Sequence, residues 1–245
     1  MKNLKLTKLG KMIRENGLDA VALIPSPNFF WLTGQNKHLM ERPTMLIIVP
    51  DRTPAMVIAG FEVASLANAA IPFSAFGFDD DPAHWVDVFK AACEALGLEG
   101  GKIGVESIHF RFFEQEILLQ ALPDCQLIAA DGLFSQLRLH KQEDELVCMR
   151  QAALIAQNAL EETLKLVKPG VTERQLAAEL VAQMLRLGSD SNLPFEPIVA
   201  GGPNSADPHA AVSDRPLQSG DFLLFDWGAR YQGFCSDITR TFGIG

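Results

Sequence analysis

The feature that most constrains this chain is a hairpin signal close to its C-terminal end. Two largely apolar runs, residues 222–225 and 238–242, flank the dipeptide Gln232-Gly233, which has its flexible residue second. Such a dipeptide suits a two-residue turn between antiparallel strands. We therefore expect a hairpin in which Tyr231 lies opposite Phe234, with much of both faces buried.

Two acidic residues share one face of this expected hairpin. Side chains alternate between the faces at every residue, and the two-residue turn places position 228 opposite Asp237. Asp226 and Asp237 then become diagonal neighbours, roughly 7–8 Å apart at the backbone. Two carboxylates that reach inward from this separation can meet at a common point.

A pair of buried carboxylates needs a compensating partner. An ionised carboxylate is costly to bury unless it is paired or bound to a metal, and two on one face also repel each other. Divalent cations that accept hard oxygen ligands, such as Mn, Mg, Ca or Zn, would remove this cost. In the alternative, Asp226 ends a strand and Asp237 pairs with Arg230 or Arg240. The spacing alone leaves both interpretations open.

Composition narrows the class of protein. A chain of 245 residues that is 48% hydrophobic can form one large or two ordinary domains. The net charge of −9 argues against a nucleic-acid partner and against binding to an anionic membrane surface. The four cysteines form no C-x-x-C pair, which indicates free thiols in a reducing compartment. With no signal peptide or anchor recognised, we expect a cytoplasmic location.

The pattern of apolar residues predicts two domains. Residues 1–137 alternate between strand-like and helix-like segments, which indicates an α/β domain with a mixed sheet. Its acidic run Asp79-Asp80-Asp81 is interpreted as a helix start capped by Asp81 rather than as a metal site. The second domain, residues 138–245, begins with a long helix, and a capping box at Thr172 begins the next one.

Four motifs of this chain resemble those of one family, and they occur in the same order. The motifs are the entry-helix pattern of Lys141, Glu145, Met149 and Arg150, the loop from Gly201 to His209, the segment Asp226-Trp-Gly228, and the segment Ser236-Asp237-Ile-Thr239-Arg240-Thr241. The family is that of the pita-bread (creatinase-fold) metallopeptidases, in its prolidase and aminopeptidase P branch. The resemblance covers the whole chain.

The resemblance implies a site and a reaction. Asp226 would bind one of two divalent metal ions (Mn, Co or Zn), and Asp237 would bridge both. His209 would be no ligand but would hydrogen-bond the substrate or the developing oxyanion. Ser236 and Thr239 would donate hydrogen bonds to the carboxylates. The implied activity is hydrolysis of the peptide bond before proline, on peptides with proline in second position.

The resemblance also implies an architecture. Residues 1–137 would form a creatinase-like N-terminal α/β domain, and residues 138–245 the first part of a pita-bread catalytic domain. In that family a segment like Asn28-Phe-Phe-Trp31-Leu-Thr-Gly34 faces the active site of a partner subunit, so Trp31 is a substrate-facing candidate in a homodimer, although core packing is the simpler interpretation. The family's remaining ligands, a histidine and two glutamates, lie beyond Gly245, so we expect a C-terminally truncated chain.

Several alternatives stay open at this point. Relatives with the same two-domain layout include amidinohydrolases and lyases, and some pita-bread domains are non-catalytic peptide-binding modules. Retention of both aspartates disfavours the metal-free and non-catalytic branches. The sequence does not separate a dipeptidase from an aminopeptidase, and it does not choose the native metal.

Overall fold

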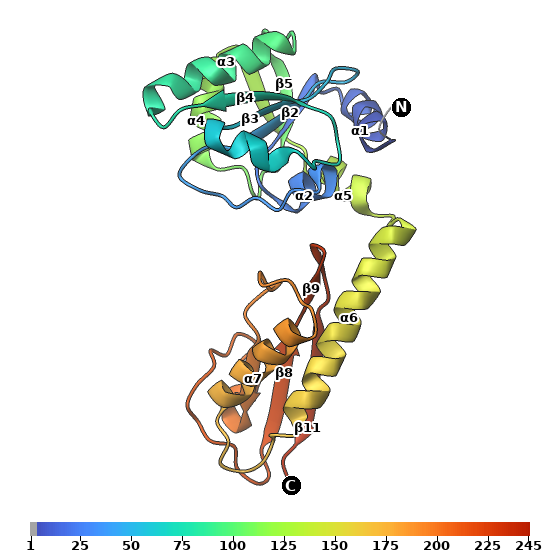
Figure 1. Cartoon of the computed structure of the whole chain (residues 1–245), viewed down its shortest axis with the longest axis vertical. Coiled ribbons are helices and arrows are strands. Elements are labelled where there is room, and N and C mark those ends of the chain that lie inside the picture. Colours follow the sequence, from blue (N-terminus) through green and yellow to red (C-terminus); the bar gives the residue numbers. More distant parts are fainter. Residues whose placement is uncertain (1–3) are drawn as a thin grey trace. The chain divides into compact units, whose positions relative to one another are not determined.

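A six-stranded mixed sheet forms the centre of the first of two units (Figure 1). The computed structural model describes residues 4–245, and the units meet in sequence between His140 and Lys141. The sheet has the order β4-β3-β2-β1-β5-β6, in which β1, β5 and β6 run parallel, as do β3 and β4, whereas β2 is antiparallel to both neighbours. Its strands are β1 (Ala20–Leu23), β2 (Met45–Ile48), β3 (Ala55–Ala59), β4 (Ser74–Phe78), β5 (Gly101–Val105) and β6 (Cys125–Ala129).

Helices cover both faces of this sheet, because its central strands are apolar on both sides. Ala20 and Ala22 lie in one buried cluster with Phe89 of α3, whereas Val21 and Leu23 lie in the other with residues of α1, α2 and α5. This alternation is the period-two pattern of a strand. The expected α/β domain with a mixed sheet is confirmed. Its helical elements are α1 (Leu4–Glu15), α2 (Pro27–Thr33), η1 (Gly60–Leu66), η2 (Pro82–His84), α3 (Trp85–Ala95), α4 (Phe112–Ala121) and α5 (Asp131–Arg138).

The acidic run at 79–81 forms a helix start, as expected. The Asp81 side chain accepts a hydrogen bond from the Ala83 N–H at 3.0 Å, and Pro82 takes the first helical position. The first turn that it caps is the 3₁₀ segment η2, which runs into α3. A neighbouring pair, Asp79 and His84, is joined at 2.9 Å between Oδ2 and Nδ1.

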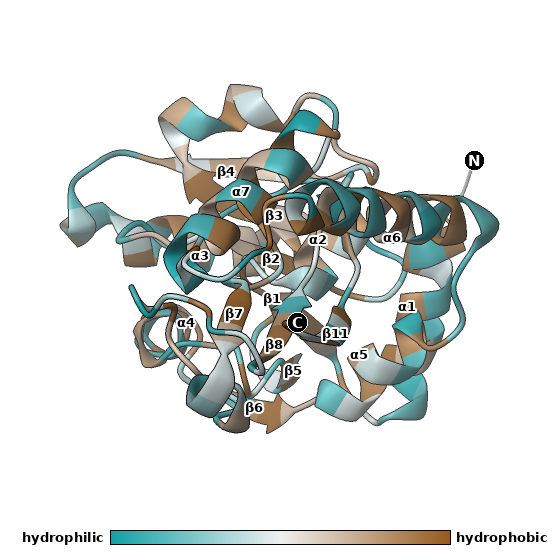
Figure 2. Cartoon of the chain, turned by 90° about the horizontal axis from the view of Figure 1, so that it is seen from below, coloured by the Kyte–Doolittle hydropathy of each residue, from teal (hydrophilic) through white to brown (hydrophobic). Residues whose placement is uncertain are grey.

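The second unit packs two helices on one face of a three-stranded antiparallel sheet of order β11-β8-β7. Figure 2 shows β7 and β8 in the brown of apolar residues, while brown and teal alternate along α6. The Trp227 indole is fully buried and donates to the Ala156 carbonyl of α6 at 3.0 Å. The elements are α6 (Glu143–Leu164), α7 (Glu173–Arg186), β7 (Ile198–Gly201), η3 (Gly202–Ala206), β8 (Phe222–Trp227), β9 (Arg230–Tyr231), β10 (Phe234–Cys235) and β11 (Ile238–Gly243).

The expectation that the hairpin is buried on much of both faces is wrong. Leu223, Phe225 and Trp227 are fully buried, but Phe222 on the other face of β8 is 66% exposed, and most of β11 is exposed as well. The helices α6 and α7 cover one face, and the residues of β8 and β11 on the other face are half-buried or exposed. Among residues 4–245, no helix combines the length and the apolarity that crossing a membrane requires.

Candidate functional site

The hairpin that carries the two aspartates has the predicted register. Tyr231 pairs with Phe234, and the two turn residues, Gln232 and Gly233, have φ values of 47° and 81°. Positive φ at both central residues is the requirement of a type I′ turn, whose twist matches that of the flanking strands. The same register continues into the long strands, where Asp226 of β8 pairs with Thr239 of β11.

This register supports a common face for the two aspartates. Thr239 lies directly opposite Asp226, and its hydroxyl donates to the Asp226 Oδ1 at 2.9 Å. Asp237 precedes Thr239 by two residues and lies one residue before β11 begins, so alternation continued from β11 predicts the same face for it. Asp226 is half-buried and Asp237 is exposed. The carboxylates are therefore accessible to a cation from solvent.

A close backbone contact interrupts both strands beside the aspartates. A Cβ at Gly228 would overlap the carbonyl oxygen of Ser236, so only glycine fits without a shift of the chain. The Ser236 N–H donates to the Ala229 carbonyl at 2.9 Å, and the Ser236 hydroxyl accepts from the Ala229 N–H at 3.0 Å. The same hydroxyl donates to the Ala152 carbonyl of α6 at 3.2 Å. This hydrogen bond links the close contact between Gly228 and Ser236 to the helix.

The Ser236 hydroxyl was expected to donate to a carboxylate, and the structure gives it other partners. Alternation explains this, because Ser236 adjoins Asp237 in sequence and so points to the opposite face, toward α6. Its hydrogen bonds in the described chain go to the main chain of Ala229 and Ala152. Thr239 does contact Asp226, and its role in orienting a bound metal's ligand stays a prediction.

The arginines named in the alternative interpretation bind elsewhere. The Arg230 guanidinium donates to the carbonyls of Asn192 and Gly233, and that of Arg240 donates to the Thr239 carbonyl. Within residues 4–245, neither aspartate forms an ion pair. The carboxylate charges of Asp226 and Asp237 are thus not neutralised by arginine in this structure.

The donor chemistry of this site fits a hard divalent cation. Two carboxylates on one accessible face, one of them oriented by a threonine hydroxyl, are ligands of the type that Mn, Mg or Zn accepts. The described residues contribute no group of three or more histidine, cysteine, aspartate or glutamate side chains arranged to hold a metal. Asp226 and Asp237 as metal ligands therefore stay a prediction, and together they would supply only part of a ligand set.

His209 lies on the loop that follows β7 and η3. Its side chain is exposed, and its backbone N–H donates to the Asp207 carboxylate at 2.9 Å. Both ends of the loop form hydrogen bonds with the side chain of Glu173. This glutamate is the first residue of α7 and is fully buried. Burial by itself raises the pKa of Glu173, but hydrogen bonds from Gly201, Ser213 and Asn204 outweigh it and lower the pKa below the ordinary 4.5. Sequence reasoning assigned no role to Glu173.

Trp31 lies in the first unit, on α2, and packs half-buried against the apolar cluster that contains Phe29 and Leu32. The Lys5 ammonium sits 4.4 Å from the centre of the Trp31 ring and donates to the Trp31 carbonyl at 2.7 Å. Packing and a cation–π contact account for this side chain within its own unit. A substrate-facing role for Trp31 stays a prediction.

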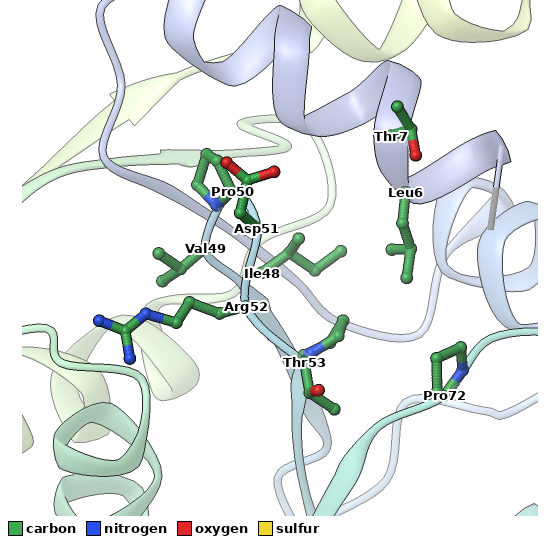
Figure 3. A pocket seen from close by; sticks show the side chains of 10 residues that line it. Leu6, Thr7, Ile48, Val49, Pro50, Asp51, Arg52, Thr53 and Pro72 are labelled. Atoms are coloured by element: carbon green, nitrogen blue, oxygen red, sulfur yellow. The ribbon is translucent and has the colours of Figure 1, made fainter. Parts of the chain in front are cut away.

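A cavity of about 400 Å³ opens in the first unit (Figure 3). Leu6, Ile48 and Pro72 contribute its apolar wall, and the Arg52 guanidinium extends away from them. The labelled side chains show no converging set of catalytic groups. The hairpin and the His209 loop therefore remain the candidate site.

Comparison with known families assigns the chain to a class. Residues 5–140 match the model described as the creatinase/prolidase N-terminal domain, and residues 147–245 match metallopeptidase family M24. The chain therefore belongs to the pita-bread metallopeptidases that carry a creatinase-type N-terminal domain, as its motifs predict.

Individual relatives agree with this assignment. The Bacillus subtilis peptidase YqhT is 29% identical over 242 residues, which are 99% of this chain and 65% of YqhT. The crystal structure of a dipeptidase from Pyrococcus horikoshii superposes with a TM-score of 0.89 at 29% identity, covering 99% of this chain and 66% of that one. The structure of an Xaa-Pro dipeptidase from Bacillus anthracis superposes with a TM-score of 0.85 at 28% identity, covering 98% of this chain and 64% of that one. The chain thus spans about 65% of the length of the curated relatives it matches.

Proposed function

We propose that this chain belongs to an Xaa-Pro exopeptidase, a hydrolase that cuts the peptide bond before proline with the help of two divalent metal ions. Membership of a metallopeptidase family supports the reaction class, and the similarity to an Xaa-Pro dipeptidase supports the substrate. The observation that carries the proposal is the register that pairs Asp226 with Thr239, because alternation from Thr239 predicts a common face for Asp226 and Asp237. The homodimer and the cytoplasmic location expected from the sequence stay predictions.

Each residue of the site has a distinct task in this proposal. A bound pair of divalent cations would supply a nucleophile at neutral pH and polarise the scissile carbonyl. Asp226 and Asp237 would hold these cations, and the Thr239 hydroxyl keeps one Asp226 oxygen engaged, so that the carboxylate has a fixed orientation. Gly228 allows the two strands to approach beside Asp237.

His209 would act on the substrate rather than on the metal. Its exposed imidazole can donate a hydrogen bond to the substrate carbonyl and to the oxyanion that develops from it. Removal of one such donor typically reduces kcat by about 10²–10³-fold. We therefore expect His209→Ala to lower kcat by about this factor while metal binding is retained.

The test uses the protein produced from its complete reading frame, with added Mn²⁺ or Co²⁺. Xaa-Pro dipeptides and longer Xaa-Pro peptides are compared with matched peptides that carry alanine in place of proline. Cleavage of the proline peptides that is lost in Asp226→Asn supports the proposal, and the preferred length separates dipeptidase from aminopeptidase action. Absence of cleavage on both lengths would refute it and favour the amidinohydrolase, lyase or peptide-binding alternatives.

A further inference from the structure

One buried carboxylate closes the loop that carries His209. Glu173 Oε1 accepts hydrogen bonds from the Gly201 N–H at 2.7 Å and from the Asn204 amide at 2.9 Å. Its other oxygen, Oε2, accepts from the Ser213 N–H at 3.0 Å and from the Ser213 hydroxyl at 2.6 Å. One side chain thus binds residues on both sides of His209.

The main chain at the start of this loop is closely packed. A Cβ at Gly201 would come within 2.5 Å of the Leu217 side chain, and Gly202 has a positive φ of 55°. A Cβ at Gly202 would also lie 2.5 Å from the Arg215 guanidinium. Arg215 is itself held by two hydrogen bonds to Asp221, at 2.7 and 3.0 Å. The start of the loop is therefore packed between the Glu173 carboxylate and a fixed ion pair.

The imidazole between these anchors depends on them for its position. The His209 side chain is exposed, whereas Ala210 beside it is buried and donates its N–H to the Asp207 carbonyl. An exposed side chain on a loop is located by its backbone, and this backbone is tied to Glu173 at positions 201 and 213. A group that must meet a reacting atom tolerates little displacement, since an error of 1 Å can cost on the order of 10²-fold in rate.

We propose that Glu173 is a positioning residue that holds His209 at the active site by binding both ends of the loop 201–213. This inference rests on the function proposed above for His209. Glu173 touches neither substrate nor metal in this scheme. Its effect on catalysis passes through His209 alone, which distinguishes it from a residue that merely stabilises the fold.

A double-mutant cycle in the protein from the complete reading frame tests this coupling. We expect Glu173→Gln to lower kcat/KM for an Xaa-Pro peptide about 10–100-fold, up to the loss of about 10²-fold that a displacement of about 1 Å can cause. In a His209→Ala background the same substitution should change kcat/KM less than about twofold. The matched control is Asp214→Asn, because Asp214 is an exposed carboxylate that also links the loop region to α7, through Arg174 at 2.7 Å. Equal losses from Glu173→Gln in both backgrounds overturn the proposal.

Amide hydrogen exchange gives a readout that does not need activity. Glu173→Gln should speed exchange of the Gly201 and Ser213 amides at least about tenfold relative to Asp214→Asn, since the Glu173 carboxylate is the acceptor of both. Ser213→Ala removes one hydroxyl that binds Glu173, and we expect this variant to fold and to show faster amide exchange at position 213. Unchanged exchange in both variants overturns the positioning role. Wild-type protein that cleaves no Xaa-Pro peptide refutes the proposed function instead, and exchange then still decides the role of Glu173 in the loop.

Discussion

Replacement of Gly228 by alanine is the sharpest test of how the hairpin positions its aspartates. A Cβ at this position would overlap the Ser236 carbonyl oxygen, and it would also lie 3.1 Å from the Ser236 carbonyl carbon and 3.2 Å from Pro194 Cγ. The first two contacts are with main chain, which cannot rotate away as a side chain can. Relief requires the strands to separate next to Asp237.

The cost follows from what the separation disrupts. Overpacking of a filled site costs about 1–3 kcal/mol. The Ser236 N–H bond to the Ala229 carbonyl, at 2.9 Å, and the Ala229 N–H bond to the Ser236 hydroxyl, at 3.0 Å, both span this contact. Each such bond contributes about 1 kcal/mol net. We therefore expect Gly228→Ala to lower the free energy of unfolding of the second unit by about 3–5 kcal/mol if both bonds are lost.

The measurement is hydrogen-exchange mass spectrometry on peptides from residues 222–243 across a urea series. Gly243→Ala is the matched control, because Gly243 lies on the same hairpin and a Cβ there meets nothing within 4 Å. The control should change the free energy of unfolding by less than about 0.5 kcal/mol. Equal stability of the two variants would show that the strands do not approach closely at Gly228, and the geometry derived for Asp237 would then be wrong.

Three further results are expected. The folded-state pKa of Glu173 lies below its ordinary 4.5, so the stability that the carboxylate contributes is complete above pH 4.5 and is lost as the pH falls through the folded-state pKa. The difference in free energy of unfolding between wild type and Glu173→Gln, measured in urea, should therefore shrink on acidification. A difference that does not change with pH would contradict this. The hydrogen bond to Asp79 raises the pKa of His84, so an NMR titration should give a pKa above 6.5, and Asp79→Asn should lower that pKa. An unchanged titration midpoint in Asp79→Asn would contradict the interaction. Burial raises the pKa of Cys93 to about 11, so a thiol reagent at about pH 8 should label exposed Cys235 first; comparable rates would contradict the burial.

Local chemistry made the hairpin predictable. The Gln232-Gly233 turn admits positive φ at both positions, and a two-residue turn leaves one register for the strands that follow. Alternation then assigns a face to every residue, including Asp226. Alternation also assigns Ser236 to the face opposite Asp237, which is why its hydroxyl contacts main chain rather than a carboxylate.

Features that depend on distant segments could not be predicted in this way. Glu173 follows the capping residue Thr172, a position where a glutamate is normally solvated and favoured by the helix dipole. Its burial arises because Gly201 and Ser213, far along the chain, converge on it. Likewise, the apolar content of residues 238–242 suggested burial on both faces, whereas burial depends on which face α6 and α7 cover.

Manganese titration tests most directly whether the two aspartates form a metal site. Isothermal titration calorimetry with Mn²⁺ is carried out on the protein from the complete reading frame, on Asp226→Asn and Asp237→Asn, and on Asp144→Asn as an exposed control in the same unit. We expect wild type and the control to bind alike, and each site variant to lose at least about tenfold in affinity, the loss that even supporting contacts commonly cause. Equal Mn²⁺ affinity in all four proteins would show that the aspartates are not metal ligands.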